Sequence, residues 1–307
     1  MKGLELARAF YKECGEPMLK RDFPELFPLI AVGLVGSGSE CYGFDDRLSR
    51  DHDFEPAFCI FLPDESVVDS KTAFLLERAY NKLPQSFMGY ERSRVNPVGG
   101  SRHGVIRTAD FFESKVGSGD GSLTLGGWLS LPDNAFFEAV NGEIFADNLG
   151  EVSRIRSRLS YYPEEIRLKK LAGQLLLAAQ SGQYNYGRCL KRGDTAAAQL
   201  AAIEFAKSAL QIAFLLSKKY MPYYKWSFRA LLSLPKYSGW AEPLEQLISS
   251  GNSDSEAEEK QAIIERIAED IATELGSASA ELEPLAYAVN DRIKDPNLRN
   301  MHILSGT

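Results

Sequence analysis

Cysteine is scarce in this sequence, and its spacing suits neither a metal centre nor a redox pair. The four cysteines are scattered, and none of them lies in a Cys-x-x-Cys motif. The pattern therefore indicates neither a zinc knuckle nor a redox-active dithiol. We expect all four thiols to be free in a reducing cytosol.

Long apolar runs are also missing. No stretch approaches the roughly 20 consecutive apolar residues that a membrane span needs. The first twenty residues mix Glu, Lys and Arg with apolar residues and lack the apolar core of a secretion signal. We therefore expect a cytoplasmic protein that does not use a membrane as partner.

A surplus of positive charge is absent as well. The formal net charge is −7 and the sequence pI is about 5.3. Binding to nucleic acid needs clustered Lys and Arg that neutralise phosphates. A local basic cleft stays open as an alternative, but the overall charge favours small molecules over polynucleotides as substrates.

The composition that is present fits a globular protein of two domains. The chain has 307 residues, of which 44% are hydrophobic and 25% are charged. Domains commonly hold about 100–200 residues. We predict an α+β fold in which residues 1–160 form a small mixed-sheet domain and residues 161–307 form an all-helical bundle.

The first half alternates strand and helix patterns, and the second half is rich in alanine and leucine. Buried strands are predicted where β-branched and apolar residues cluster, and helices where apolar residues recur every three to four positions. The predicted strands are Leu29–Val35, His52–Leu62, Gly104–Thr108 and Gly142–Ala146. The main predicted helices are Leu4–Cys14, Ser39–Phe44, Lys71–Lys82, Ala109–Val116, Glu164–Gln180, Ala196–Tyr220 and Ser255–Leu275.

The segment VGSGSECYGFDDRLSRDHDF, residues 35–54, carries the clearest chemical signal. A glycine-serine turn between a strand and a helix brings backbone N–H groups close to an anion. Here that turn contains Gly38 and Ser39. Asp51 and Asp53 follow at the alternating positions of a predicted strand, so both carboxylates project to one side. Paired carboxylates are hard ligands for Mg²⁺ beside substrate phosphates, and a two-ion site stabilises phosphoryl-type transfer.

This segment resembles the signature of the DNA polymerase beta-like nucleotidyltransferase superfamily, in which a Gly-Ser pair precedes Asp-x-Asp or Asp-x-Glu by about a dozen residues. The loop before the acidic pair is one residue longer than in the commonest antibiotic-modifying members, and His52 replaces the usual apolar residue between the acids. The matching positions are Gly38-Ser39, Gly43, Ser49, Asp51 and Asp53.

The helical half resembles members that are similar to kanamycin nucleotidyltransferase, which carry a helical bundle after the catalytic domain. The stretches YYPEEIRLKK (161–170) and YMPYYKW (220–226) also resemble an uncharacterised bacterial branch of the superfamily. By analogy, the helical half is a candidate interface for a homodimer.

Further candidates for the site are less specific. Glu55 is in phase with the acidic pair, and Asp147 flanks a predicted strand, so each is a candidate third carboxylate; the alternative for each is a helix cap or a solvated acid. Arg50 and Lys225 are candidate phosphate ligands, with solvent exposure as the alternative. Arg154, Arg156 and Arg158 would share one face of an extended segment and either clamp a triphosphate or face solvent.

The resemblance implies an enzyme that transfers a nucleoside monophosphate from ATP or another nucleoside triphosphate to a hydroxyl group of a small molecule or protein and releases pyrophosphate. A nucleotide-binding regulatory or toxin–antitoxin-type module on the same fold, without turnover, is the alternative. A metal-dependent phosphohydrolase is a third class, disfavoured because clustered His and Asp motifs are absent.

Overall fold

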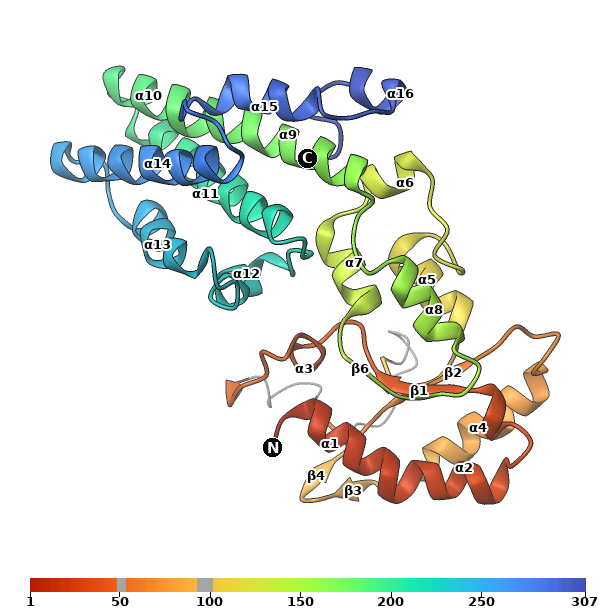
Figure 1. Ribbon diagram of the computed structural model, residues 1–307. Coiled ribbons are helices and arrows are strands. Elements are labelled where there is room, and N and C mark those ends of the chain that lie inside the picture. Colours follow the sequence, from red (N-terminus) through yellow and green to blue (C-terminus); the bar gives the residue numbers. More distant parts are fainter. Residues whose placement is uncertain (49–53, 93–101) are drawn as a thin grey trace. The chain divides into compact units, whose positions relative to one another are not determined.

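The computed structural model describes residues 1–48, 54–92 and 102–307, which group into two compact units. Unit 1 comprises Met1–Leu123 and Asn134–Ser160, and unit 2 comprises Thr124–Asp133 and Tyr161–Thr307. A small mixed sheet and many helices make up the structure (Figure 1). The predicted mixture of helix and sheet is thus confirmed.

Unit 1 is built on a four-stranded sheet of order β5-β2-β1-β6. β1 pairs antiparallel with both β2 and β6, whereas β2 pairs parallel with β5. The strands are β1 (Ala31–Leu34), β2 (Cys59–Leu62), β5 (Gly104–Arg107) and β6 (Glu143–Asp147). A separate two-stranded ladder joins β3 (Ser86–Phe87) to β4 (Tyr90–Glu91).

The strand directions bring four chain segments to one edge of the sheet. In the register, Gly33 near the end of β1 faces Cys59 at the start of β2. Cys59 in turn faces Gly104 at the start of β5, and Leu34 faces Glu143 at the start of β6. We call this the turn edge: the end of β1 together with the starts of β2, β5 and β6.

Helices cover both faces of the sheet (Figure 1). Side chains of β1 and β2 such as Val32 and Ile60 share a core with the N-terminal helices and α4. Phe61 points the other way and lies 5.3 Å, centroid to centroid, from Phe111 of α5. The helices are α1 (Gly3–Phe10), the π-helical turn η1 (Tyr11–Gly15), α2 (Glu16–Asp22), α4 (Ser70–Asn81) and α5 (Thr108–Val116).

The ring of Phe58 lies at the centre of the core shared with the N-terminal helices. Its centroid is 5.8 Å from that of Phe10, 5.5 Å from that of Tyr11 and 5.1 Å from that of Tyr80. A Cβ atom on Gly15 would lie only 2.4 Å from Phe58 Cζ. Glycine at this position therefore lets the helical segment lie directly on the aromatic ring.

The second strand is shorter than the sequence predicts. Alternation predicts a strand over His52–Leu62, but β2 begins at Cys59, and Phe54–Phe58 lies outside the sheet. Pro56 has no N–H to give to a ladder, and it precedes a strand that is interior, with β1 and β5 as neighbours. Strand alternation therefore does not orient Glu55, and that part of the prediction is wrong.

The arginine-rich segment is helical, not extended as predicted. It forms α8 (Glu151–Arg158), where successive residues turn by about 100°. Arg156 donates to the carbonyl oxygens of Val140 and Asn141 at 2.5 and 2.8 Å. Arg158 donates instead to the Asp120 carbonyl oxygen at 2.7 Å. Arg156 therefore lies on a different face of α8 from Arg154 and Arg158, which are one helical turn apart.

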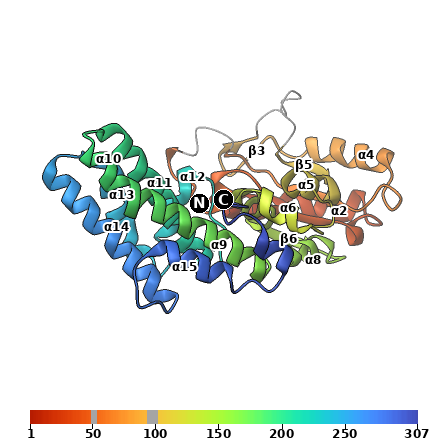
Figure 2. The ribbon, with the colours of Figure 1, turned by 90° about the horizontal axis from the view of Figure 1, so that it is seen from above.

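Unit 2 is helical. In Figure 1 and Figure 2, α9 runs alongside α15, and it packs against α11 as well. The helices of unit 2 are α6 (Leu125–Ser130), α9 (Glu164–Ala178), the π-helical segment η4 (Ala179–Tyr186), α10 (Gly187–Lys191), α11 (Thr195–Leu216), α12 (Tyr224–Leu231), η5 (Ser238–Trp240), α13 (Ala241–Ser249), α14 (Asp254–Glu274), α15 (Leu282–Asn290) and α16 (Pro296–Asn300).

Of the helices that the structure describes, α11 has the length and hydropathy that would allow it to cross a membrane. More than half of its most apolar window is buried inside the protein, and a core helix of a soluble protein has the same features. Its contacts with α9, α12 and α13 account for the apolar composition.

Three buried lysines hold unit 2 together through neutral oxygen atoms. Lys260 of α14 donates to Gln199 Oε1 at 2.6 Å, to the Ser250 carbonyl at 2.9 Å and to Asn252 Oδ1 at 3.3 Å. On α9, Lys169 and Lys170 bind carbonyl oxygens of the C-terminal segment. Burial lowers the pKa of all three ammonium groups. Each lysine therefore links its helix to another segment of unit 2 through hydrogen bonds.

Lys260→Ala should destabilise unit 2 by about 2–4 kcal/mol, because the three hydrogen bonds of a buried ammonium group are lost. All three tryptophans, Trp128, Trp226 and Trp240, belong to this unit, so tryptophan fluorescence during urea unfolding measures the effect. The matched control is Lys207→Ala on exposed α11 surface, which should cost less than about 0.5 kcal/mol. Equal losses for both variants would contradict this role.

Candidate functional site

Both glycines of the turn after β1 have a positive φ. Gly36 has φ 95° and Gly38 has φ 122°, a region that residues with a side chain rarely adopt. The chain then enters the short helix α3 (Ser39–Tyr42), which ends at Gly43 with φ 75°. As at every helix start, the first N–H groups lack a partner inside the helix. The predicted turn and short helix are confirmed.

Asn141 fixes the first glycine of this turn from a distant part of the sequence. Its side chain accepts from the Gly36 N–H and donates to the Gly36 carbonyl, both at 2.8 Å. Asn141 is buried and follows α7 (Asp133–Val140). Both polar backbone groups of Gly36 are thereby satisfied by one amide, which holds the turn in a single conformation.

Glu138 of α7 links Ser37, the next residue of the turn, to Lys115 through hydrogen bonds. One carboxylate oxygen accepts from Ser37 Oγ at 2.7 Å and from Lys115 Nζ at 2.6 Å, and the other accepts from Tyr42 Oη at 2.7 Å. Lys115 also lies 3.0 Å from Ser37 Oγ. Burial alone would raise the pKa of the Glu138 carboxyl, but the hydrogen bonds from Lys115, Tyr42 and Ser37 outweigh burial and hold this pKa below its usual value.

A second cation, Arg102, lies against the last glycine. Its Nη2 atom donates to the Ser37 carbonyl at 2.7 Å and to Glu40 Oε1 at 2.6 Å. A Cβ atom on Gly38 would lie 2.0 Å from the same Nη2 atom and 2.4 Å from Glu40 Oε1. Any residue other than glycine at position 38 would displace this ion pair. Arg102 is therefore part of the surroundings of the turn.

The chain segments that precede β2 and β5 also meet at the turn edge. His103 Nδ1 lies 3.1 Å from Glu55 Oε1. A Cβ atom on Gly3 would lie 2.5 Å from Glu40 Cβ and 3.3 Å from Phe54 Cε2, so the Phe54 ring is near α3. Phe54 follows the acidic pair directly in the sequence. The structure thus brings Glu55, a candidate third carboxylate, to the same edge as the glycine turn.

Asp147 lies at the opposite end of the sheet from the turn. It faces Ala31, the first residue of β1, about 10 Å along the strand from Leu34 at some 3.3 Å per residue. Its Oδ2 atom accepts from the Ser153 N–H at 2.7 Å, in the first turn of α8. These contacts favour the helix-cap alternative for Asp147 over a catalytic role.

The remaining predicted site residues are not part of the described turn edge. Arg50, Asp51 and Asp53 lie outside the described residues, so their contacts stay predictions. Lys225 belongs to unit 2, where it is exposed and its Nζ lies 5.3 Å from the Trp226 ring centroid. Among residues 1–48, 54–92 and 102–307, no group of three or more His, Cys, Asp or Glu side chains forms a metal site.

Sequence reasoning missed the side chains that hold the turn. Glu138 and Asn141 lie more than 95 residues away from it, and α7 was not predicted. A signal for that helix was present: Asp133 follows a proline at its start, and Gly142 follows its last turn. No spacing rule, however, connects these positions with Gly36.

The comparisons with known proteins match part of this region. Residues 128–227 match a family model described as a domain of unknown function (DUF4037). No curated protein and no solved structure matches the chain. The matched range includes Glu138 and Asn141, whereas the glycine turn and the acidic pair lie outside it.

Asn141→Ala should free the glycine turn, because the Gly36 N–H and carbonyl each lose a buried partner. The loss of two hydrogen bonds, about 1 kcal/mol each, should accelerate amide hydrogen exchange across residues 31–42 by roughly 10- to 30-fold. Asn81→Ala, at an exposed position, is the control and should leave this exchange unchanged. Unaltered exchange in Asn141→Ala would show that another contact holds the turn.

Glu138→Gln should change how the stability of unit 1 depends on pH. The folded-state pKa of Glu138 is lowered, so its contribution is fully present above the unfolded value of 4.5 and is lost as pH falls through the folded pKa. The variant should therefore lose stability at pH 7 and show a flatter decline below pH 4.5. Thermal unfolding followed by circular dichroism across pH 3–7 measures both effects; parallel pH curves for variant and wild type would contradict this assignment.

Proposed function

We propose that this chain is a metal-dependent nucleotidyltransferase of the DNA polymerase beta-like superfamily. In this proposal, a small mixed-sheet nucleotidyltransferase domain precedes an all-helical bundle domain. The observation that carries the proposal is the turn edge: the glycine turn after β1 and the segment leading into β2 approach the same end of the sheet. The acidic pair, Asp51 and Asp53, belongs to the segment that leads into β2.

The backbone of the turn would bind the phosphates of the nucleotide. Gly38 brings the main chain close to a ligand, and Ser39 adds N–H and hydroxyl donors at the start of α3. Asn141 fixes the turn before substrate arrives, so binding requires little reorganisation. Arg102 and Lys115 supply positive charge on the two sides of Ser37, although each already pairs with a carboxylate.

Asp51 and Asp53 would hold Mg²⁺, because two neighbouring carboxylates are hard ligands for this ion. The superfamily resemblance implies a pair of such ions, which would neutralise the charge of the triphosphate. An acceptor hydroxyl would attack the α-phosphorus of ATP or another nucleoside triphosphate. A new phosphorus–oxygen bond forms, the bond to the β-phosphate oxygen breaks, pyrophosphate leaves, and the hydroxyl proton passes to a base. Glu55, paired with His103, is the described carboxylate of the turn edge nearest in sequence to the acidic pair.

The acceptor in this proposal is a small molecule or a protein side chain, as the acidic overall charge disfavours nucleic acid. Arg50 and Lys225 remain proposed phosphate ligands, and a homodimer through the helical half remains a proposal by analogy.

Asp51→Asn and Asp53→Asn should each reduce nucleotide transfer at least about 1,000-fold, because each removes a charged ligand at the centre of phosphoryl transfer. Transfer is measured from nucleoside triphosphates labelled at the α-phosphate, with magnesium, to a panel of hydroxyl acceptors and to the protein itself. Pyrophosphate release is measured in parallel. Asp64→Asn, an exposed acid after β2, is the control and should keep full activity.

The products distinguish the rival functions. Tight nucleotide binding with no labelled product across the acceptor panel would identify a binding module without turnover. Release of inorganic phosphate in place of pyrophosphate would identify a phosphohydrolase. Activity that survives both aspartate substitutions would overturn the proposed site.

A further inference from the structure

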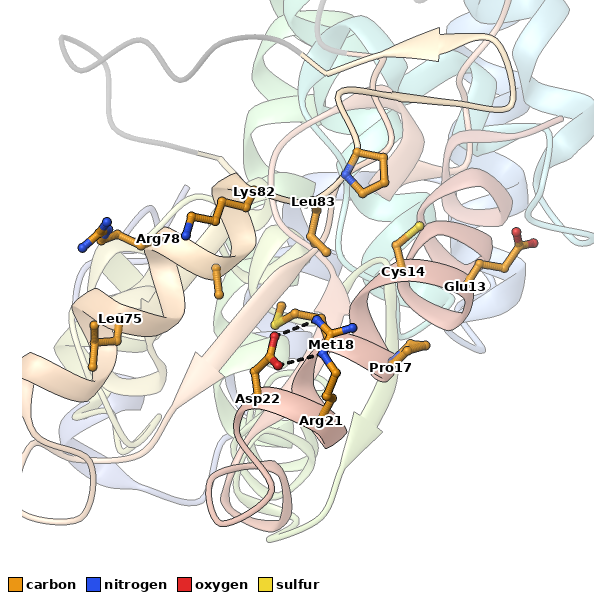
Figure 3. A pocket seen from close by; sticks show the side chains of 12 residues that line it. Glu13, Cys14, Pro17, Met18, Arg21, Asp22, Leu75, Arg78, Lys82 and Leu83 are labelled. Atoms are coloured by element: carbon orange, nitrogen blue, oxygen red, sulfur yellow. Dashed lines mark hydrogen bonds and ion pairs between the residues drawn. The ribbon is translucent and has the colours of Figure 1, made fainter.

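A groove separate from the turn edge runs between α2 and α4 in unit 1. Its volume is about 550 Å³. Small-molecule sites commonly measure about 300–1,000 Å³ and combine an apolar lining with a few polar groups. Figure 3 shows the two sides of the groove, with Arg21 and Asp22 on α2 and Leu75, Arg78 and Lys82 on or next to α4.

The floor of the groove is apolar and firmly held. Met18 and Leu83 line it and are also members of the buried core of unit 1. Leu75 lines the α4 side and is 44% exposed. Of these three side chains, Leu75 is the one whose apolar surface a ligand could remove from water, since Met18 and Leu83 are already buried.

The groove is lined by more unpaired positive charge than negative charge. Arg21 and Asp22 neutralise each other through two hydrogen bonds of 2.7 Å. Arg78 of α4 and Lys82, the residue that follows this helix, stand about one helical turn apart, and neither forms an ion pair with any residue in the described parts of the chain. The Arg78 guanidinium lies 6.0 Å from the centroid of the Phe74 ring. Glu13 adds one negative charge. Two cations without a carboxylate partner therefore face one free acid, in a chain whose net charge is −7.

The helix on the other side of the groove is irregular where it contributes to the lining. Glu13 and Cys14 belong to the π-helical turn η1. Such turns are rare and occur frequently at functional sites. Gly15 keeps this turn pressed on Phe58, so the irregular backbone is supported from the core side.

We propose that the groove between α2 and α4 binds an amphipathic organic anion. Arg78 and Lys82 hold its anionic group, and its apolar part covers Leu75, beside the buried Met18 and Leu83. A cation would meet the two unpaired positive charges, and a small inorganic anion would leave Leu75 exposed to water. The shared chemistry is a single carboxylate or phosphate at the end of an apolar chain. The site is independent of the proposed nucleotide transfer.

Octanoate and octyl phosphate, used below their micelle-forming concentrations, test this proposal by isothermal titration calorimetry on the full chain. Both should bind, whereas acetate, which lacks the apolar chain, and octylammonium, which reverses the charge, should not. The stronger of the two anions identifies the head group as carboxylate or phosphate. No binding of either anion at 10 mM, or equal binding of octylammonium, would overturn the proposal.

The double variant Arg78→Gln/Lys82→Gln should weaken binding of the stronger probe at least 10-fold. Lys71→Gln removes an exposed cation of the same helix that does not line the groove, and it should change the affinity less than twofold. All these positions are exposed, and circular dichroism verifies that each variant is folded. Equal weakening by Lys71→Gln would show a general charge effect and would overturn the assignment.

The rate at which Cys14 is alkylated reports whether the probe binds in the groove. It lines the groove and is partly buried, as is Cys189 of unit 2, whereas Cys41 and Cys59 are buried. The bound probe should slow alkylation of Cys14 at least threefold and leave Cys189 unchanged, as measured by mass spectrometry of peptides. Binding without protection of Cys14 would place the ligand elsewhere and refute the groove as its site.

Discussion

The antiparallel pairing of β1 with both of its neighbours is the constraint on which the candidate site depends. Because β2 and β6 run against β1, the chain leaves β1 at the edge where β2 and β6 begin. The parallel partner of β2 adds the start of β5 to the same edge. Arg102, Glu55 and Asn141 therefore lie at one edge of the sheet although they come from separate regions of the sequence. A single reversal of strand direction would separate them.

Local chemistry allowed much of this arrangement to be predicted. The strand before the turn and the short helix after it depend on residues that are close together in the sequence. Both elements were therefore predicted to within two residues at each end, as β1 and α3. The alternation that predicted strand structure over residues 54–58 was wrong, because Phe58 is buried against helices and not within the sheet, whereas Cys59–Leu62 does form a strand. Periodicity identifies which residues are buried but not which element buries them.

The supports of the turn could not be predicted in the same way. Asn141 and Glu138 act on Gly36 and Ser37 through contacts that arise only when α7 packs beside the sheet. Asp147 is the opposite example. Its position beside a predicted strand made it a candidate third carboxylate, but the strand register places it opposite Ala31, at the start of β1 and away from the turn. Such long-range contacts follow from topology, and a lone sequence does not specify which acid the topology will bring to the turn.

The π-helical turn at Tyr11–Gly15 has a consequence for how this chain can change in length. A π turn contains one residue more than the α-helical turn that it replaces. Removing one residue inside it would restore a regular helix and keep both flanking segments facing their present neighbours. Elsewhere in a helix, the same deletion would rotate everything that follows by about 100°. The N-terminal helix of unit 1 thus contains a point at which its length is adjustable while its packing is retained.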